Sequence, residues 1–142
     1  MNAHRLSRFA VAVALFAAFS AATAPQNGAQ RQPLTALSMI EPGQWQLKES
    51  DSGALRRLCV DSPTSLLQIQ HGPAQCSHFV VENSPTVATV HYTCPGHGHG
   101  RTTVTVETPR LARVETQGVA DGAPFSIDFE ARRIGSCGAG GR

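Results

Sequence analysis

CSHFVVENSPTVATVHYTC, residues 76–94, holds two β-rich runs on either side of a turn signal. Asn83-Ser84-Pro85 is typical of a turn, and the β-branched and aromatic run 87–93 is typical of a strand. A hairpin folded at this turn places His78 opposite Tyr92 and brings the two flanking cysteines face to face. The segment therefore predicts a pair of antiparallel strands that a disulfide can close at its open end.

The chain has four cysteines, which allow three pairings. Directly opposed residues on antiparallel strands have Cβ atoms about 4.5–5.5 Å apart, near disulfide range, and this favours Cys76–Cys94. The remaining pair would then be Cys59–Cys137. The consecutive pairing, Cys59–Cys76 with Cys94–Cys137, stays open, because the shift of one strand would allow it. In an oxidising compartment such a set staples a small domain with two disulfides.

Alternation with a period of two continues outside this hairpin. Apolar Phe125, Ile127, Phe129 and Ala131 alternate with polar residues, as in a half-buried strand, and similar runs surround residues 44–48 and 103–107. Asp61-Ser62-Pro63 followed by SLLQIQ predicts one short helix. The order is strand, strand, short helix and five further strands. We therefore expect a mainly β fold, an antiparallel meander sheet or partly closed barrel with one short helix and two disulfides.

Residues 1–24 have the layout of a signal peptide, with a basic start, the apolar run FAVAVALFAAF and small residues before the cleavage point. Cleavage is predicted after Ala22 or Ala24. The apolar run is shorter than the about 20 residues that a membrane span needs, so we expect no integral membrane protein after cleavage. We expect a flexible lead-in at 25–38, a β-rich disulfide-stapled domain at 39–137 and a disordered tail at 138–142.

The charge of the mature chain argues against nucleic acid as a partner. The full chain has 12 Lys and Arg against 10 Asp and Glu, and two arginines but no acid leave with the leader. The mature chain is then formally neutral. Its basic residues are scattered, with Arg56-Arg57 and Arg132-Arg133 as the doublets, whereas nucleic-acid binding needs a basic stripe.

Short motifs occur in a characteristic order along the domain. They are PGQW at 42–45, RLCV at 57–60, the lone Cys76, CPG at 94–96 and RRIGSC at 132–137. This order resembles a group of small exported Gram-negative proteins that is catalogued as domain of unknown function 3617. The resemblance covers residues 41–137, with Val60 in place of the usual Leu and an unusual histidine-rich loop. It implies a periplasmic, β-rich domain and no particular activity.

Histidines are concentrated between residues 71 and 99, most tightly in HYTCPGHGHG at 91–100. His97 and His99 flank a glycine, and His78 on the predicted hairpin could supply a third imidazole for Zn²⁺ or Cu²⁺. The alternative is a flexible glycine loop with solvated histidines. A metal site needs three or four convergent ligands and only two are local, so we expect no cofactor, with Zn or Cu as the alternative.

No catalytic signature accompanies these features. The sequence has no G-x-S-x-G nucleophile elbow and no phosphate-binding glycine motif, so we expect no enzyme. The function that we predict is a non-enzymatic binding or envelope-associated module of the periplasm. Its partner would be an envelope component or a small apolar ligand in a sheet concavity. The alternative is a periplasmic metal-binding protein that uses the histidine-rich loop.

Overall fold

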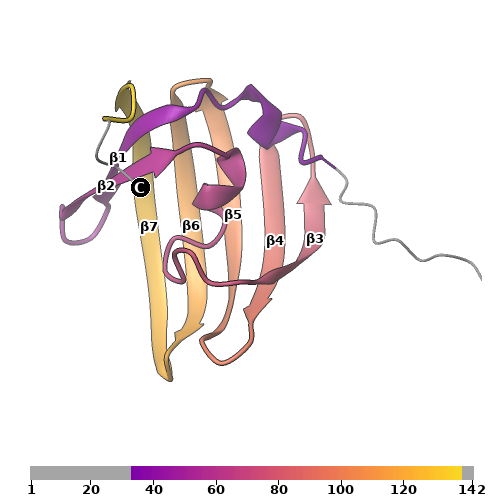
Figure 1. Ribbon diagram of the computed structural model, residues 1–142. Helices are drawn as coiled ribbons and strands as arrows, with labels where there is room; N and C mark the ends of the chain where they lie inside the picture. The colour runs from indigo at the N-terminus through magenta and orange to yellow at the C-terminus, as the bar shows by residue number, and fades with distance from the viewer. Residues whose placement is uncertain (1–32, 139–142) are drawn as a thin grey trace, which may run out of the picture. The chain divides into compact units, whose positions relative to one another are not determined.

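The computed structural model describes residues 33–138, so the predicted leader and the tail beyond Gly138 lie outside the described residues. Within this range the fold is mainly β, as predicted (Figure 1). Its elements are η1 (Ala36–Met39), β1 (Gly43–Glu49), β2 (Leu55–Val60), η2 (Pro63–Leu66), β3 (Ser77–Asn83), β4 (Val87–Cys94), β5 (Gly98–Thr108), β6 (Leu111–Ala120) and β7 (Ala123–Gly135), where η is a 3₁₀ helix.

The strands form one antiparallel sheet in the order β2-β1-β7-β6-β5-β4-β3. Strands β3 to β7 follow one another as a meander. The first hairpin then adds to β7, so that β1 lies beside the last strand of the chain. The sheet stays open, with β2 and β3 as its edges. Among residues 33–138, no helix is long and apolar enough to cross a membrane.

One face of the sheet carries the core, and both 3₁₀ helices lie over it (Figure 1). Trp45, the single tryptophan, is fully buried, as are Leu47, Val104 and Val114 on neighbouring strands. The ordered structure begins earlier than residue 39, the predicted domain boundary. Ala36 and Leu37 are buried because η1 contacts β4 and β5, which gives the apolar residues of this segment a surface to cover.

The predicted short helix is a single 3₁₀ turn, η2, with Pro63 in its first turn. Leu66 and Leu67 are both buried in the core although they are adjacent in sequence. The residues after Leu66, which we expected to continue the helix, form a bend and turns instead.

The hairpin of β3 and β4 has the predicted register, with His78 paired to Tyr92. A bulge at Val81, which the sequence did not indicate, shifts the register between Val80 and Glu82. The two disulfides have the predicted connectivity. They are Cys76–Cys94, with a Cα–Cα distance of 4.2 Å, and Cys59–Cys137, with a Cα–Cα distance of 5.5 Å. The consecutive pairing is therefore excluded.

A buried pair of side chains, His71 and Tyr92, ties the segment after η2 to the sheet. His71 Nε2 lies 3.1 Å from the carbonyl oxygen of Val119, and its Nδ1 lies 3.2 Å from the Tyr92 hydroxyl. A carbonyl can only accept, so Nε2 donates to Val119, and Nδ1 shares a hydrogen bond with the Tyr92 hydroxyl. The pair therefore joins two elements that are distant in sequence.

Glycines make room for this pair. A Cβ atom on Gly100 would lie 2.5 Å from the Tyr92 hydroxyl oxygen, because the phenol ring lies across the backbone of β5. A Cβ atom on Gly98 would overlap the carbonyl oxygen of Val119, and Gly98 also has a φ of +119°, which disfavours other residues. Two glycines of the predicted histidine loop therefore serve packing at the sheet face.

Candidate functional site

A hollow of about 370 Å³ lies where the β5–β6 turn meets the C-terminal part of β7. Three arginines, two aliphatic residues and a threonine line it. They are Arg110, Arg132, Arg133, Leu111, Ile134 and Thr108. The described residues that line this hollow include no acidic side chain. We call this set the arginine hollow.

The three arginines reach the hollow by different routes. Arg110 belongs to the two-residue turn that joins β5 to β6, and Arg132 and Arg133 are consecutive on β7. Consecutive strand residues point to opposite faces. The Arg133 side chain is only 16% exposed, whereas that of Arg132 is 57% exposed. Strand alternation thus gives the hollow one packed guanidinium and one that is open to solvent.

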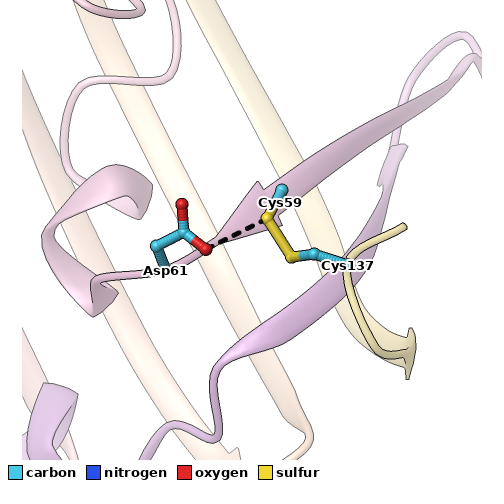
Figure 2. A group of neighbouring side chains, drawn as sticks. All are labelled: Cys59, Asp61 and Cys137. Carbon is cyan, nitrogen blue, oxygen red and sulfur yellow. Dashed lines mark hydrogen bonds between the residues drawn. A yellow bond between two sulfur atoms is a disulfide. The ribbon is translucent and has the colours of Figure 1, made fainter. Parts of the chain in front are cut away.

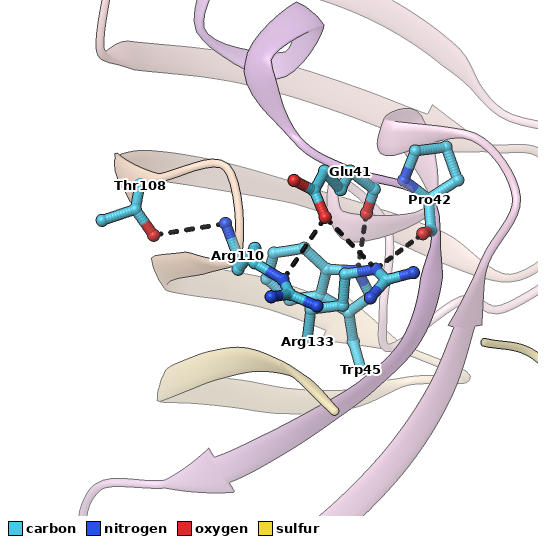
Figure 3. Close-up of polar contacts among 6 residues, drawn as sticks. All are labelled: Glu41, Pro42, Trp45, Thr108, Arg110 and Arg133. Atoms are coloured by element: carbon cyan, nitrogen blue, oxygen red, sulfur yellow. Dashed lines mark hydrogen bonds and ion pairs between the residues drawn. The ribbon is translucent and has the colours of Figure 1, made fainter. Parts of the chain in front are cut away.

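Glu41, which precedes β1, places its carboxylate between two of these arginines (Figure 3). Its Oε2 atom lies 3.3 Å from Arg110 Nε and 3.7 Å from Arg133 Nε. These distances are long for charge-assisted hydrogen bonds, which are about 2.7–2.9 Å. The carboxylate therefore neutralises part of the local charge without saturating either guanidinium.

The backbone fixes this arrangement independently of the Glu41 side chain (Figure 3). The Glu41 amide donates to the carbonyl oxygen of Pro109 at 2.9 Å, and Trp45 Nε1 donates to the Glu41 carbonyl oxygen at 3.0 Å. Arg133 Nε donates to the carbonyl oxygen of Pro42 at 2.8 Å. Glu41 and Arg133 thus keep their relative positions through contacts that a change of the Glu41 carboxyl group does not remove.

The chemistry of the arginine hollow favours the binding of an anion. A guanidinium carries five N–H donors in a planar fork that matches carboxylate and phosphate oxygens. Leu111 and Ile134 add apolar surface, and Ile134 is 46% exposed. Among its described lining residues the Thr108 hydroxyl is the one side-chain nucleophile, and no histidine or carboxylate stands beside it as a base.

A second hollow, of about 130 Å³, is the weaker candidate. It lies over β5, β6 and β7 and is lined mostly by polar side chains, among them Arg101, Glu115 and Asp128. Glu115 and Asp128 are directly opposed in the β6–β7 register. One cation beside two carboxylates leaves a net negative charge, which disfavours an anion. The hollow also lacks the apolar surface that gives a small ligand binding energy.

The predicted metal ligands are distributed over different parts of the structure. His97 Nδ1 lies 3.3 Å from Asp121 Oδ1 in an exposed pair between two turns. The register pairs His78 with Tyr92, and Tyr92 with Gly100, so His99 points to the opposite face of the sheet from His78. The structure does not bring the three imidazoles together. Metal binding stays a prediction that would require the loop to rearrange.

One group of three possible metal ligands, Cys59, Asp61 and Cys137, occurs among the described residues (Figure 2). Both sulfur atoms belong to one disulfide, so no thiolate is available to bind an ion. The Asp61 Oδ1 atom lies 3.3 Å from Cys59 Sγ. A disulfide sulfur carries no hydrogen, and this approach is therefore a packing contact. The group gives no evidence for a metal site.

The predicted location for a small apolar ligand, a concavity of the sheet, is filled by the protein itself. Trp45, Leu66 and Leu67 are buried against the sheet face that the 3₁₀ helices cover. Sequence reasoning noted the doublet Arg132-Arg133 but did not connect it with Arg110 or Glu41. The signal that could have found the site is a pairing of β1 with β7, which brings RRIG beside EPGQW.

A family model described as a protein of unknown function, DUF3617, matches residues 40–137 of the chain. The match spans the sheet and both disulfides. The comparisons found no match among curated proteins and none among solved structures.

Proposed function

The chain belongs to the DUF3617 family of proteins of unknown function, and we propose that it is a non-enzymatic binding protein whose arginine hollow holds an anionic ligand. One observation carries the proposal. Three arginines line one hollow beside two aliphatic side chains that water can reach, and the carboxylates next to these arginines, those of Glu41 and Glu130, do not line it. Clusters of arginine are a common means of recognising phosphate and carboxylate groups.

We propose that the protein acts in the periplasm after cleavage of a leader at residues 1–24. Its two disulfides fit an extracellular or exported protein, because disulfides persist in oxidising compartments. The arrangement of the first residues, basic then apolar then small, supports export through a signal peptide. Anionic groups are available in such a compartment as free metabolites and as components of the envelope.

The test is a titration of the protein with octyl phosphate at low ionic strength. Arg110→Gln combined with Arg132→Gln should weaken binding by roughly tenfold or more, because each change removes charge-assisted hydrogen bonds. These two arginines are chosen because they are exposed. Arg133 is left in place, since it is packed and donates to the Pro42 carbonyl oxygen.

The matched control is Arg101→Gln. Arg101 is an exposed arginine outside the hollow, and the register places it beside Gln117, six residues along β6 from Leu111. Each strand residue advances about 3.3 Å, so Arg101 lies roughly 20 Å from the hollow. Its loss should leave the affinity for octyl phosphate within a factor of about two of wild type, since charges beyond roughly 10 Å are screened. Equal weakening by both variants, or no binding by the wild type, would refute the proposed site.

A further inference from the structure

We infer that the carboxylate of Glu41 occupies the position of the ligand's acid group, and that the ligand is an amphiphile whose apolar part covers Ile134 and Leu111. This inference rests on the proposed function, because it assumes that the arginine hollow binds an anion. It adds the chemical class of the ligand and an internal competitor for its site. A carboxylate or phosphate ester with an adjoining hydrocarbon chain has this chemistry.

The position of Glu41 supports the competition. A single carboxylate oxygen lies near the Nε atoms of both Arg110 and Arg133, at 3.3 and 3.7 Å. An external acid group that sought the same two guanidinium groups would meet this oxygen. The Glu41 side chain is 49% exposed, so it can turn away into solvent while its backbone contacts with Pro109 and Trp45 persist.

The aliphatic lining supports an amphiphile over a small inorganic anion. Arg132 is paired with Leu111 across β6 and β7, and Ile134 follows two residues later on the same face of β7. The exposed guanidinium and the two aliphatic side chains therefore adjoin one another within the hollow. A hydrocarbon chain attached to the acid group would leave water when it covers Ile134, which favours binding.

The first test compares Glu41→Gln with wild type in titrations with octyl phosphate and with inorganic phosphate. Glutamine keeps the size of the side chain but removes the competing charge. Affinity for both probes should rise roughly twofold to fivefold, the range that an exposed ion pair allows. The matched control is Glu82→Gln, which removes an exposed carboxylate on β3, the edge strand four strands away from β7, and should leave both affinities unchanged.

The second test separates the acid group from the apolar part. In a series of butyl, hexyl and octyl phosphate, each buried methylene should tighten binding by roughly fourfold at most. Ile134→Ser should weaken the binding of octyl phosphate and reduce this dependence on chain length. The affinity for inorganic phosphate should stay unchanged. Ile134 is already partly exposed, so the variant should fold. Urea unfolding of each variant checks this.

The outcomes distinguish this inference from the proposed function. If the wild type binds octyl phosphate through Arg110 and Arg132 but Glu41→Gln does not tighten binding, the internal competitor is refuted and the anion site stands. If affinity does not depend on chain length or on Ile134, the ligand is a simple anion. Failure of the wild type to bind any of the alkyl phosphates would refute the proposed function itself.

Discussion

Tyr92 is the residue on which the packing of the covering segment depends. It is the single tyrosine of the chain, it is 2% exposed, and its hydroxyl meets His71 Nδ1. The ring of His71 also contacts those of Tyr92 and Phe125, with centroids 5.2 and 6.1 Å apart. One phenol therefore joins β4 to the segment that follows η2, through a hydrogen bond and through ring contacts.

Replacement of Tyr92 by Phe should lower the free energy of unfolding by about 1–3 kcal/mol. The phenyl ring still fills the space over Gly100, but His71 Nδ1 is left buried without its hydrogen-bond partner. Urea unfolding followed by tryptophan fluorescence measures the change. The matched control is His91→Gln on the exposed side of β4, which should stay within about 0.5 kcal/mol of wild type. Equal effects of the two variants would contradict the role of Tyr92.

Stability should also depend on alkaline pH through Tyr92. Burial raises its pKa above the usual 10.0, and hydrogen bonds with Thr116 and Thr102 partly oppose that rise. A phenol with a raised pKa in the folded state stabilises fully below the unfolded pKa, and this contribution is lost as pH rises through the folded pKa. The free energy of unfolding should therefore fall above about pH 10, and Tyr92→Phe should reduce that fall. Identical pH profiles would exclude this explanation.

At the scale of elements, the disulfides fix two different parts of the sheet. Cys76–Cys94 closes the β3–β4 hairpin, and Cys59–Cys137 joins the end of β2 to the residues after β7. The second bridge holds the first hairpin against the last strand. It therefore supports the neighbourhood in which Glu41 meets Arg133.

Loss of the longer bridge should be the more damaging. The sequence separations are 78 and 18 residues, for which chain entropy gives about 4.5 and about 3 kcal/mol. Replacing each cysteine pair by alanine and measuring urea unfolding tests the order. If loss of Cys76–Cys94 costs more than loss of Cys59–Cys137, native packing around the hairpin outweighs loop closure.

Local signals in the sequence were sufficient for the strands and the disulfides. Alternation in residues 125–132 and the turn residues at 83–85 act within a few residues, so they predicted β7 and the β3–β4 hairpin. The bulge at Val81 could not be predicted, because the sequence pattern does not show which residue of a strand is left unpaired in the ladder. The short extent of η2 was not predicted either; its Leu66 and Leu67 pack in a core that residues distant in sequence form.

Local signals also could not predict the arginine hollow, because its residues are distant from one another in sequence. Its residues come from positions 41, 110 and 132–134, and the pairing of β1 with β7 brings the first and last of these together. The histidine loop differs from the arginine hollow, because its residues are close in sequence and suggested a metal site, but they are apart in the structure. Strand alternation separates His78 from His99, and His97 lies beside Asp121.

The histidine loop remains open to a direct test of the metal hypothesis. With the imidazoles apart, we expect no binding of Zn²⁺ or Cu²⁺ tighter than the millimolar range in calorimetry of tag-free protein at neutral pH. Micromolar binding that His97→Ala with His99→Ala abolishes would overturn this expectation. It would show that the loop rearranges to collect its ligands.

At the scale of the whole molecule, the open sheet separates stability from binding. The core lies under η1 and η2, whereas the arginine hollow lies at the end of the β5–β6 hairpin, beside the C-terminal part of β7. Exposed residues of the hollow can therefore change without loss of the core. The full chain has a formal net charge of only +2, so attraction of an anion depends on this local cluster rather than on the net charge.

The most direct measurement is native mass spectrometry of protein that is expressed from the full sequence in a Gram-negative host and purified gently. We predict that the wild type retains an anionic, apolar molecule, and that Arg110→Gln with Arg132→Gln loses it while Arg101→Gln keeps it. A wild type that carries no added mass and does not bind octyl phosphate afterwards, or retention that is equal in all three proteins, would contradict a ligand site at the arginine hollow.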